Sequence, residues 1–184
     1  MDPLSIELAL AETAAATRRA LALARAAMVV PLRMLSLAWL VLCPVAVLIG
    51  RDHLGPFVGL SLLVVTGLAW RRYRRASDAT GVRARLWPWL AVAFVALVGG
   101  VLTSRGGTQL DIPWLNEAGP FLINATALAC LARLIKSAVL AYAAGLMAVV
   151  SVLAAATLTG DTAVAAQLAL YALLMLAASA RMVP

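Results

Sequence analysis

Residues 137–158 read SAVLAYAAGLMAVVSVLAAATL, and none of these 22 side chains is charged. A helix that rises about 1.5 Å per residue needs roughly 20 residues to cross a hydrocarbon core of about 30 Å. In lipid the backbone polar groups must bond to one another, so a run of this kind forms a helix. The segment therefore predicts a membrane-spanning helix.

Charge-free segments of this type recur along the chain. The six predicted spans are residues 34–50, 54–70, 86–103, 118–132, 137–158 and 162–180. The fourth is the shortest at 15 residues, and we expect it to be extended by Asn116 and Glu117 at its start or by the apolar stem of Arg133 at its end. The pattern predicts an all-α polytopic membrane protein, a bundle of six transmembrane helices.

The composition of the 184-residue chain agrees with this class. Hydrophobic residues make up 64% and charged residues 12%, against about 45–50% and 25% in soluble domains. This surplus of apolar surface excludes an ordinary soluble enzyme and a disordered chain. The net charge of +7 does not indicate nucleic-acid binding, because the cations are divided among the segments between spans. Cys43 and Cys130 each lie in an apolar run, so neither a disulfide nor a thiolate metal site is expected.

The basic residues are divided unevenly between the two sides of the membrane. With the N-terminus inside, thirteen of the fifteen Lys and Arg residues lie on the cytoplasmic side, and only Arg51 and Arg105 lie outside. Short cytoplasmic loops of membrane proteins are enriched in Lys and Arg, so both termini are predicted to be cytoplasmic. The 14:1 ratio of Arg to Lys is typical of a GC-rich genome and favours the inner membrane of a bacterium.

Residues 1–27 are expected to form a separate cytoplasmic amphipathic helix, ahead of a transmembrane domain at 28–184. Asp2 can cap this helix, and Pro3 suits its first turn. One face carries residues at spacings of three, four and seven: Ile6, Leu10, Thr13, Thr17, Leu21 and Met28. The helix could lie on the inner leaflet or pair with a partner helix, and the sequence leaves both open.

A cluster of arginines follows the second span. It consists of Arg71, Arg72, Arg74, Arg75, Arg83 and Arg85. These cations anchor the second and third spans on the cytoplasmic side, and they could also contact anionic lipid headgroups, at about 1 kcal/mol per cation near the surface. Neither role identifies an activity.

Two neutral amides, Asn124 and Gln167, lie within predicted spans, whereas none of the six spans contains an ionisable acid or base. The simpler interpretation is that each amide forms a hydrogen bond between helices. The alternative is that both line a path for a ligand or substrate. The sequence favours the first.

The predicted outer loops hold the residues most suited to chemistry, namely Asp52, His53, Asp111 and Glu117. A histidine beside carboxylates could act as a base or bind a metal. No ligand spacing recurs, however, and outer loops are polar in any case, so solvated loop residues are favoured. We predict no catalytic residue, no metal ligand and no cofactor.

Several sequence features occur in a recognisable order. Pro44-Val45 lies in the first span, the basic stretch 71–75 follows the second, and Pro113-Trp114 precedes a span that opens Gly119-Pro120-Phe121-Leu122-Ile123-Asn124. In this order, residues 36–137 resemble the intracellular septation protein A group of small bacterial inner-membrane proteins. The resemblance implies a role in cell-envelope synthesis or division and provides no established catalytic residues.

Three functions are consistent with the sequence. The first is a non-enzymatic partner or scaffold in envelope biogenesis or division, with residues 1–27 contacting a protein partner. The second is a small transporter of a lipid or hydrophobic compound, with Asn124 and Gln167 along its path. The third is a membrane enzyme with a site on the outer face. The sequence favours the first and leaves the substrate, the partner and the oligomeric state open.

Overall fold

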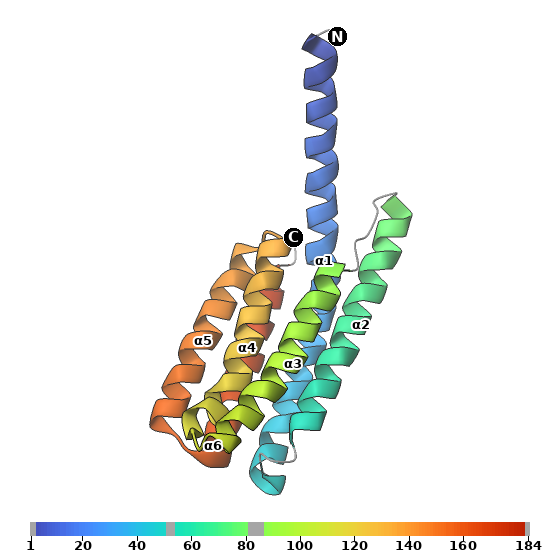
Figure 1. Cartoon of the computed structure of the whole chain (residues 1–184). Helices are drawn as coiled ribbons and strands as arrows, with labels where there is room; N and C mark the ends of the chain where they lie inside the picture. Colours follow the sequence, from blue (N-terminus) through green and yellow to red (C-terminus); the bar gives the residue numbers. More distant parts are fainter. Residues whose placement is uncertain (1–2, 51–53, 81–86, 183–184) are drawn as a thin grey trace.

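A computed structural model describes residues 3–50, 54–80 and 87–182, and in this part of the chain all regular structure is helical (Figure 1). The helices are α1 (Pro3–Ile49), α2 (Leu54–Thr80), α3 (Trp87–Gln109), α4 (Pro113–Leu134), α5 (Ala138–Thr157) and α6 (Gly160–Arg181). The predicted all-α class is confirmed.

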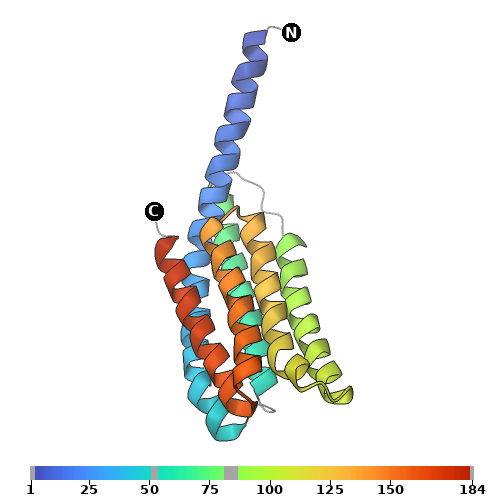
Figure 2. The ribbon, with the colours of Figure 1, turned by 90° about the vertical axis from the view of Figure 1, so that its left-hand side faces the viewer.

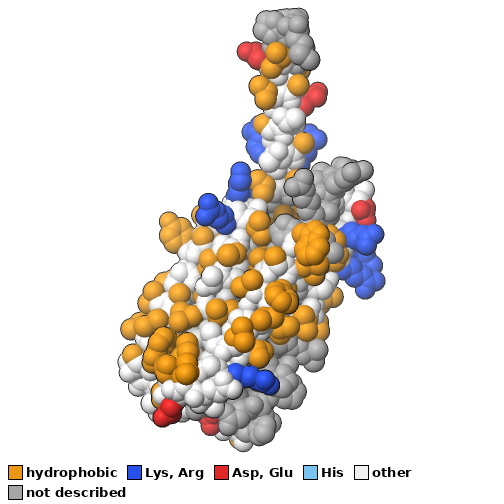
Figure 3. Space-filling view, in the orientation of Figure 1, with side chains coloured by type: hydrophobic (Ala, Val, Ile, Leu, Met, Phe, Trp, Pro, Cys, Tyr) orange, Lys and Arg blue, Asp and Glu red, His pale blue; other side chains and the backbone are white. Residues whose placement is uncertain are grey.

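Four of the helices are long and apolar enough to cross a membrane, as judged over the described residues. The qualifying segments are Ile6–Leu48 in α1, Leu90–Gln109 in α3, Ala138–Thr157 in α5 and Gly160–Arg181 in α6. Figure 3 shows hydrophobic side chains over the middle of the bundle, with charged side chains toward its two ends and along the projecting part of α1. This distribution is the one expected of a membrane protein.

Helix α1 is a single helix of 47 residues, although the sequence predicted a boundary near residue 27. Residues 20–28 consist of Ala, Leu, Arg and Met, which are strong helix formers, so nothing there ends the helix. Pro31 and Pro44 lie inside it and do not divide it in the described structure. Figures 1 and 2 show its N-terminal part projecting beyond the bundle, in line with the part that packs there.

The bundle is a ring of helices. Helix α1 packs against α2 and α6, α4 packs against α3 and α5, α5 packs against α6, and a light contact between α2 and α3 closes the ring. We call the end with the α4–α5 turn and the C-terminus the upper end, and the end with the α3–α4 and α5–α6 turns the lower end (Figures 1 and 2).

Aromatic side chains occupy the centre of the packed core. Trp39 is 1% exposed and Tyr171 is fully buried. The ring of Tyr171 lies 5.8 Å from that of Trp39 and 5.4 Å, edge to face, from that of Phe121. These three residues join α1, α4 and α6 near the middle of the bundle.

Candidate functional site

Glycines bring α3 and α4 together in the lower half of the bundle. A Cβ atom added to Gly107 would lie 2.5 Å from the backbone nitrogen of Asn116, a distance that no real Cβ keeps. A Cβ atom added to Gly99 would lie 2.8 Å from Cγ2 of Ile123 on α4, and one added to Gly119 would lie 2.8 Å from Cβ of Thr103 on α3. Helices α3 and α4 are therefore closely packed in this part of the bundle.

The upper half of the bundle contains a cavity between α1, α2, α3 and α4. Its volume is about 90 Å³, counted as the space open to the centre of a water-sized sphere, and a single water needs roughly 10–15 Å³ on that measure. Residues from five helices line it, among them Met28, Trp39, Ala69, Ala96, Asn124, Leu131 and Met175. Across this space, no described Cα atom of α1 comes within 8 Å of one of α4.

Two polar atoms of the cavity lining have no hydrogen-bond partner in the described part of the chain. They are Oδ1 of Asn124 on α4 and Nε1 of Trp39 on α1, and both are buried. A buried polar atom without a partner costs about 1–3 kcal/mol, so such atoms are rare and call for an explanation. Oε1 of Gln167, which lies outside the cavity lining, is a third buried atom without a partner in the described part of the chain.

Gln167 lies elsewhere. Its Nε2 atom donates a hydrogen bond of 3.4 Å to the backbone oxygen of Glu117, which links α6 to α4 near the lower end. Gln167 is fully buried, and it is not part of the cavity lining. The two intramembrane amides therefore differ in place: Gln167 bonds to α4 through Nε2, and Asn124 borders the cavity. The side-chain oxygen of each is buried without a partner in the described part of the chain.

Of the four outer-loop residues, the structure describes Asp111 and Glu117. Glu117 is buried, and its Oε1 atom accepts a hydrogen bond of 3.0 Å from the backbone nitrogen of Gly160, at the start of α6. A carboxylate in this position complements the positive end of the helix dipole. Asp111 is exposed in the α3–α4 turn, and Asp52 and His53 lie outside the described residues. Within the described ranges, no group of three or more His, Cys, Asp or Glu residues could hold a metal ion.

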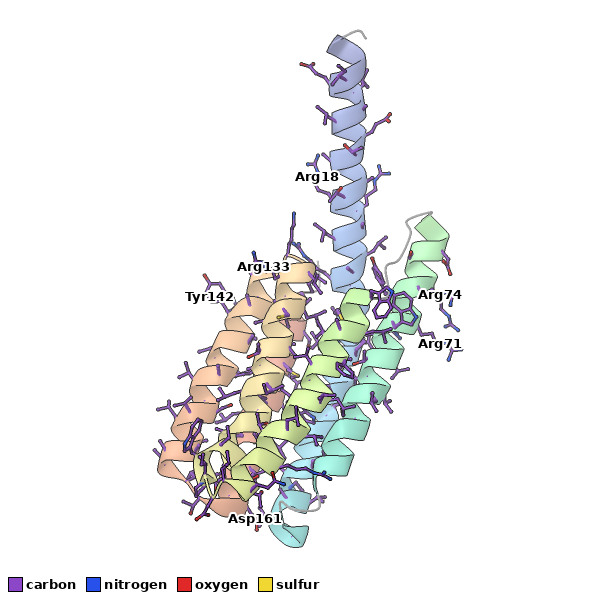
Figure 4. All side chains as sticks on the ribbon, in the orientation of Figure 1. Arg18, Arg71, Arg74, Arg133, Tyr142 and Asp161 are labelled. Carbon is purple, nitrogen blue, oxygen red and sulfur yellow. The ribbon has the colours of Figure 1, made fainter. Side chains whose placement is uncertain are left out.

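The arginines after the second predicted span lie at the upper end of α2. Arg71, Arg72, Arg74 and Arg75 are exposed, and Arg83 and Arg85 lie outside the described residues. Arg71 and Arg74 point away from the bundle (Figure 4), and Arg74 lies 3.9 Å from the carboxylate of Asp78. These side chains therefore face the surroundings of the bundle and not the cavity.

Two residues that the sequence did not single out have defined roles in the structure. Trp39 borders the cavity, and its only signal is a Trp in the middle of a span, away from the interfaces that Trp prefers. Arg25 on α1 donates through Nε to the backbone oxygen of Ile135, at 3.1 Å, and through Nη2 to that of Lys136. It therefore ties α1 to the α4–α5 turn.

The fold and the cavity define a helical bundle of membrane type with a partly open pocket between its helices. Comparison of the chain with protein-family models, with curated proteins and with solved structures finds no match. The resemblance to the septation protein A group stays a prediction.

Proposed function

We propose that the protein is a bacterial inner-membrane protein that crosses the membrane six times, has both termini in the cytoplasm, and binds a hydrophobic compound or lipid in the cavity. In this orientation the upper end of the bundle is cytoplasmic. The support is the charge distribution, with thirteen cations on one side and two on the other. The exposed arginines of α2 then lie at the level of the inner-leaflet headgroups, where we expect them to bind anionic lipids.

The observation that carries the proposal is the cavity of about 90 Å³ between α1, α2, α3 and α4, which is lined mainly by apolar side chains. Pockets for small molecules are mostly apolar and contain a few polar groups that fix the orientation of the ligand. The cavity therefore supports ligand binding, with Asn124 among the residues of its wall.

A cavity-filling variant tests the proposal. Ala127 lines the cavity and is buried, whereas Ala129 lies on the same helix and is exposed. Ala127→Leu should lower the amount of hydrophobic compound that is extracted from the purified protein and measured by mass spectrometry, and Ala129→Leu should leave it unchanged. If both variants retain the wild-type amount while their melting temperatures show intact folding, the cavity is not the binding site.

A second function, as a non-enzymatic partner or scaffold, is favoured by the projecting part of α1. Ile6, Leu8 and Leu10 are 46%, 63% and 64% exposed there. An apolar helix surface of this kind suits the groove of a partner protein, and the resemblance to the septation protein A group places that partner in envelope biogenesis or division. Deletion of residues 2–19 should leave the bundle in the membrane but abolish the cellular role. Full complementation by the shortened chain would contradict this function.

A further inference from the structure

We infer that a cytoplasmic partner binds this protein through an acidic amphipathic helix, which lies along the projecting part of α1 and rests on the basic upper end of the bundle. The inference rests on the proposed partner function and specifies the chemistry of the partner.

The surface that receives this helix is one face of the projecting part of α1, here called the α1 stripe. It consists of Ile6, Leu10, Thr13, Thr17 and Leu21. At 3.6 residues per turn, the same face continues into Ala24, Met28 and Leu32, which are buried in the bundle. Ile6 and Leu10 are exposed. The face that packs on other helices within the bundle therefore continues beyond it, with no described helix to cover it.

The two threonines do not make the α1 stripe polar. The hydroxyl of Thr13 donates to the backbone oxygen of Leu10, at 2.9 Å, and the hydroxyl of Thr17 donates to that of Thr13, at 2.8 Å. Each hydroxyl is paired within α1, so an apolar partner face can cover the stripe without leaving these polar groups unpaired.

The charges near the bundle end of the α1 stripe determine the polar residues of the partner. Four exposed cations lie at the upper end of the bundle or on α1 above it: Arg18, Arg133, Lys136 and Arg181 (Figure 4 labels the first two). The bonds of Arg25 place the α4–α5 turn beside α1, and Nε of Arg33, 3.3 Å from Oγ of Ser179, places the last turn of α6 there too. None of the four cations forms an ion pair with a described carboxylate. Carboxylates flanking the apolar face of the partner helix would meet them, whereas a basic helix would be repelled.

The direction of α1 argues against a lipid surface as the occupant. The projecting part continues the line of the packed part (Figures 1 and 2), and Arg25 lies level with the α4–α5 turn. At about 1.5 Å per residue, Ile6 stands about 28 Å beyond Arg25. A headgroup layer is roughly 5–8 Å thick, so Ile6 and Leu10 lie beyond it.

A second copy of the chain does not fit the α1 stripe either. Because the stripe continues the buried face of α1, a helix that lies on it stands above the bundle of the same chain. The α1 helix of a second copy continues into its own bundle, which would then occupy the place of the first. A parallel pair would also set Arg18 against Arg18. The partner helix is therefore a cytoplasmic segment that does not continue into the membrane.

The test measures peptide binding to the full-length protein in phosphatidylcholine nanodiscs by fluorescence anisotropy. Three labelled helical peptides of about 16 residues, the length from Ile6 to Leu21, carry leucines at spacings of three and four on one face. Their other positions are alanine with glutamate, lysine or glutamine. The glutamate peptide should bind about tenfold more tightly than the glutamine peptide, and the lysine peptide should bind least. Raising NaCl from about 50 mM to about 500 mM should weaken binding of the glutamate peptide.

Two matched leucines identify the face. Leu8 and Leu10 are 63% and 64% exposed, but they lie on opposite sides of α1, because two residues turn a helix by about 200°. Leu10→Gln should weaken binding of the glutamate peptide about tenfold, the factor expected of one buried leucine, and Leu8→Gln should leave it unchanged. Arg133→Gln should weaken the glutamate peptide and not the glutamine peptide. Arg71→Gln should weaken neither, because Arg71 points away from the bundle (Figure 4).

The outcomes separate the inference from the function on which it rests. No binding of the glutamate peptide, equal binding of the lysine peptide, or equal effects of Leu8→Gln and Leu10→Gln would overturn the acidic helix. A dimer that Leu10→Gln dissociates in sedimentation would assign the α1 stripe to a second copy. Protection of Leu10→Cys from an impermeant maleimide in phosphatidylglycerol nanodiscs, but not in phosphatidylcholine, would assign it to the membrane. The partner function itself is judged by complementation with the chain that lacks residues 2–19, and full complementation would reject both.

Discussion

The hydroxyl of Tyr171 joins three helices at a single point. It lies 3.1 Å from the backbone oxygen of Phe121 on α4 and 2.9 Å from that of Met147 on α5, and it also contacts Oγ of Ser151. The side chain is fully buried in α6, so no water can replace these partners. Removal of the Tyr171 hydroxyl would leave these oxygen atoms with one hydrogen-bond partner fewer in apolar surroundings.

We therefore expect Tyr171→Phe to lower the free energy of unfolding by about 1 kcal/mol, the usual net value of a buried hydrogen bond. Thermal melting in detergent measures the change. Tyr142→Phe is the matched control, because Tyr142 is 76% exposed on α5 and points away from the bundle (Figure 4). Equal melting temperatures for the two variants would show that the Tyr171 hydroxyl contributes nothing.

The sequence identified some of these residues but not their partners. Asn124 and Gln167 stand out because an amide is unusual in a charge-free span. Which of them meets another helix depends on how each helix is rotated about its axis, and neighbouring positions on a helix point about 100° apart. Trp39 and Tyr171 carry a weaker signal, because an aromatic residue in the middle of a span is ordinarily part of the packing.

At the scale of elements, the attachment of α1 to the bundle depends on Arg25. Its guanidinium donates to the backbone oxygens of Ile135 and Lys136, where α4 ends, and a cation is favourable at this end of a helix. We expect Arg25→Ala to make the α4–α5 turn more sensitive to protease and to lower the melting temperature. Arg18→Ala should do neither, because Nε of Arg18 bonds only to Ala14 within its own helix. A turn equally resistant in both variants would contradict this role of Arg25.

The contact between α3 and α4 gives a second prediction at this scale. The Cβ atom of an alanine at position 107 would clash with the backbone of Asn116. By contrast, nothing lies within 4 Å of a Cβ atom added to Gly106. Because Ala favours a helix over Gly by about 0.5–1 kcal/mol, Gly106→Ala should stabilise the bundle slightly. Gly107→Ala should destabilise it, by roughly 1–3 kcal/mol. Melting temperatures that change in the same direction for both variants would show that α3 and α4 are not closely packed there.

The elements themselves could be predicted in large part. The charge-free runs coincide with helices. The fourth run was expected to extend through Asn116 and Glu117 or through Arg133, and α4 runs from Pro113 to Leu134 and contains all three. The sequence predicted a separate helix up to about residue 27, whereas α1 continues through this position because strong helix formers occupy residues 20–28. Glu117 illustrates the same limit: its position in a turn suggested a solvated carboxylate, and packing against the start of α6 buries it.

At the scale of the whole molecule, the charged residues divide between the two ends of the bundle. Arg18, Arg71, Arg74 and Arg133 lie at the upper end or on the part of α1 beyond it, and Asp161 lies at the lower end (Figure 4). Helices α2 and α4 run between the same two ends as the four helices that qualify as spans. A crossing by all six helices keeps every cation of the upper end on one side of the membrane.

Reporter fusions at the turns distinguish six crossings from four. With six, fusions after Lys136 and Pro184 should be active only as a cytoplasmic reporter, and fusions after Asp111 and Thr159 only as an external one. If α1, α3, α5 and α6 alone crossed, the basic end of α2 would lie outside, against the positive-inside rule, and Asp111 would be cytoplasmic. The two arrangements agree at Lys136, Thr159 and Pro184, so these fusions serve as internal controls. The Asp111 fusion therefore decides between them, and a cytoplasmic signal there would reject the six-span arrangement while leaving the helical bundle intact.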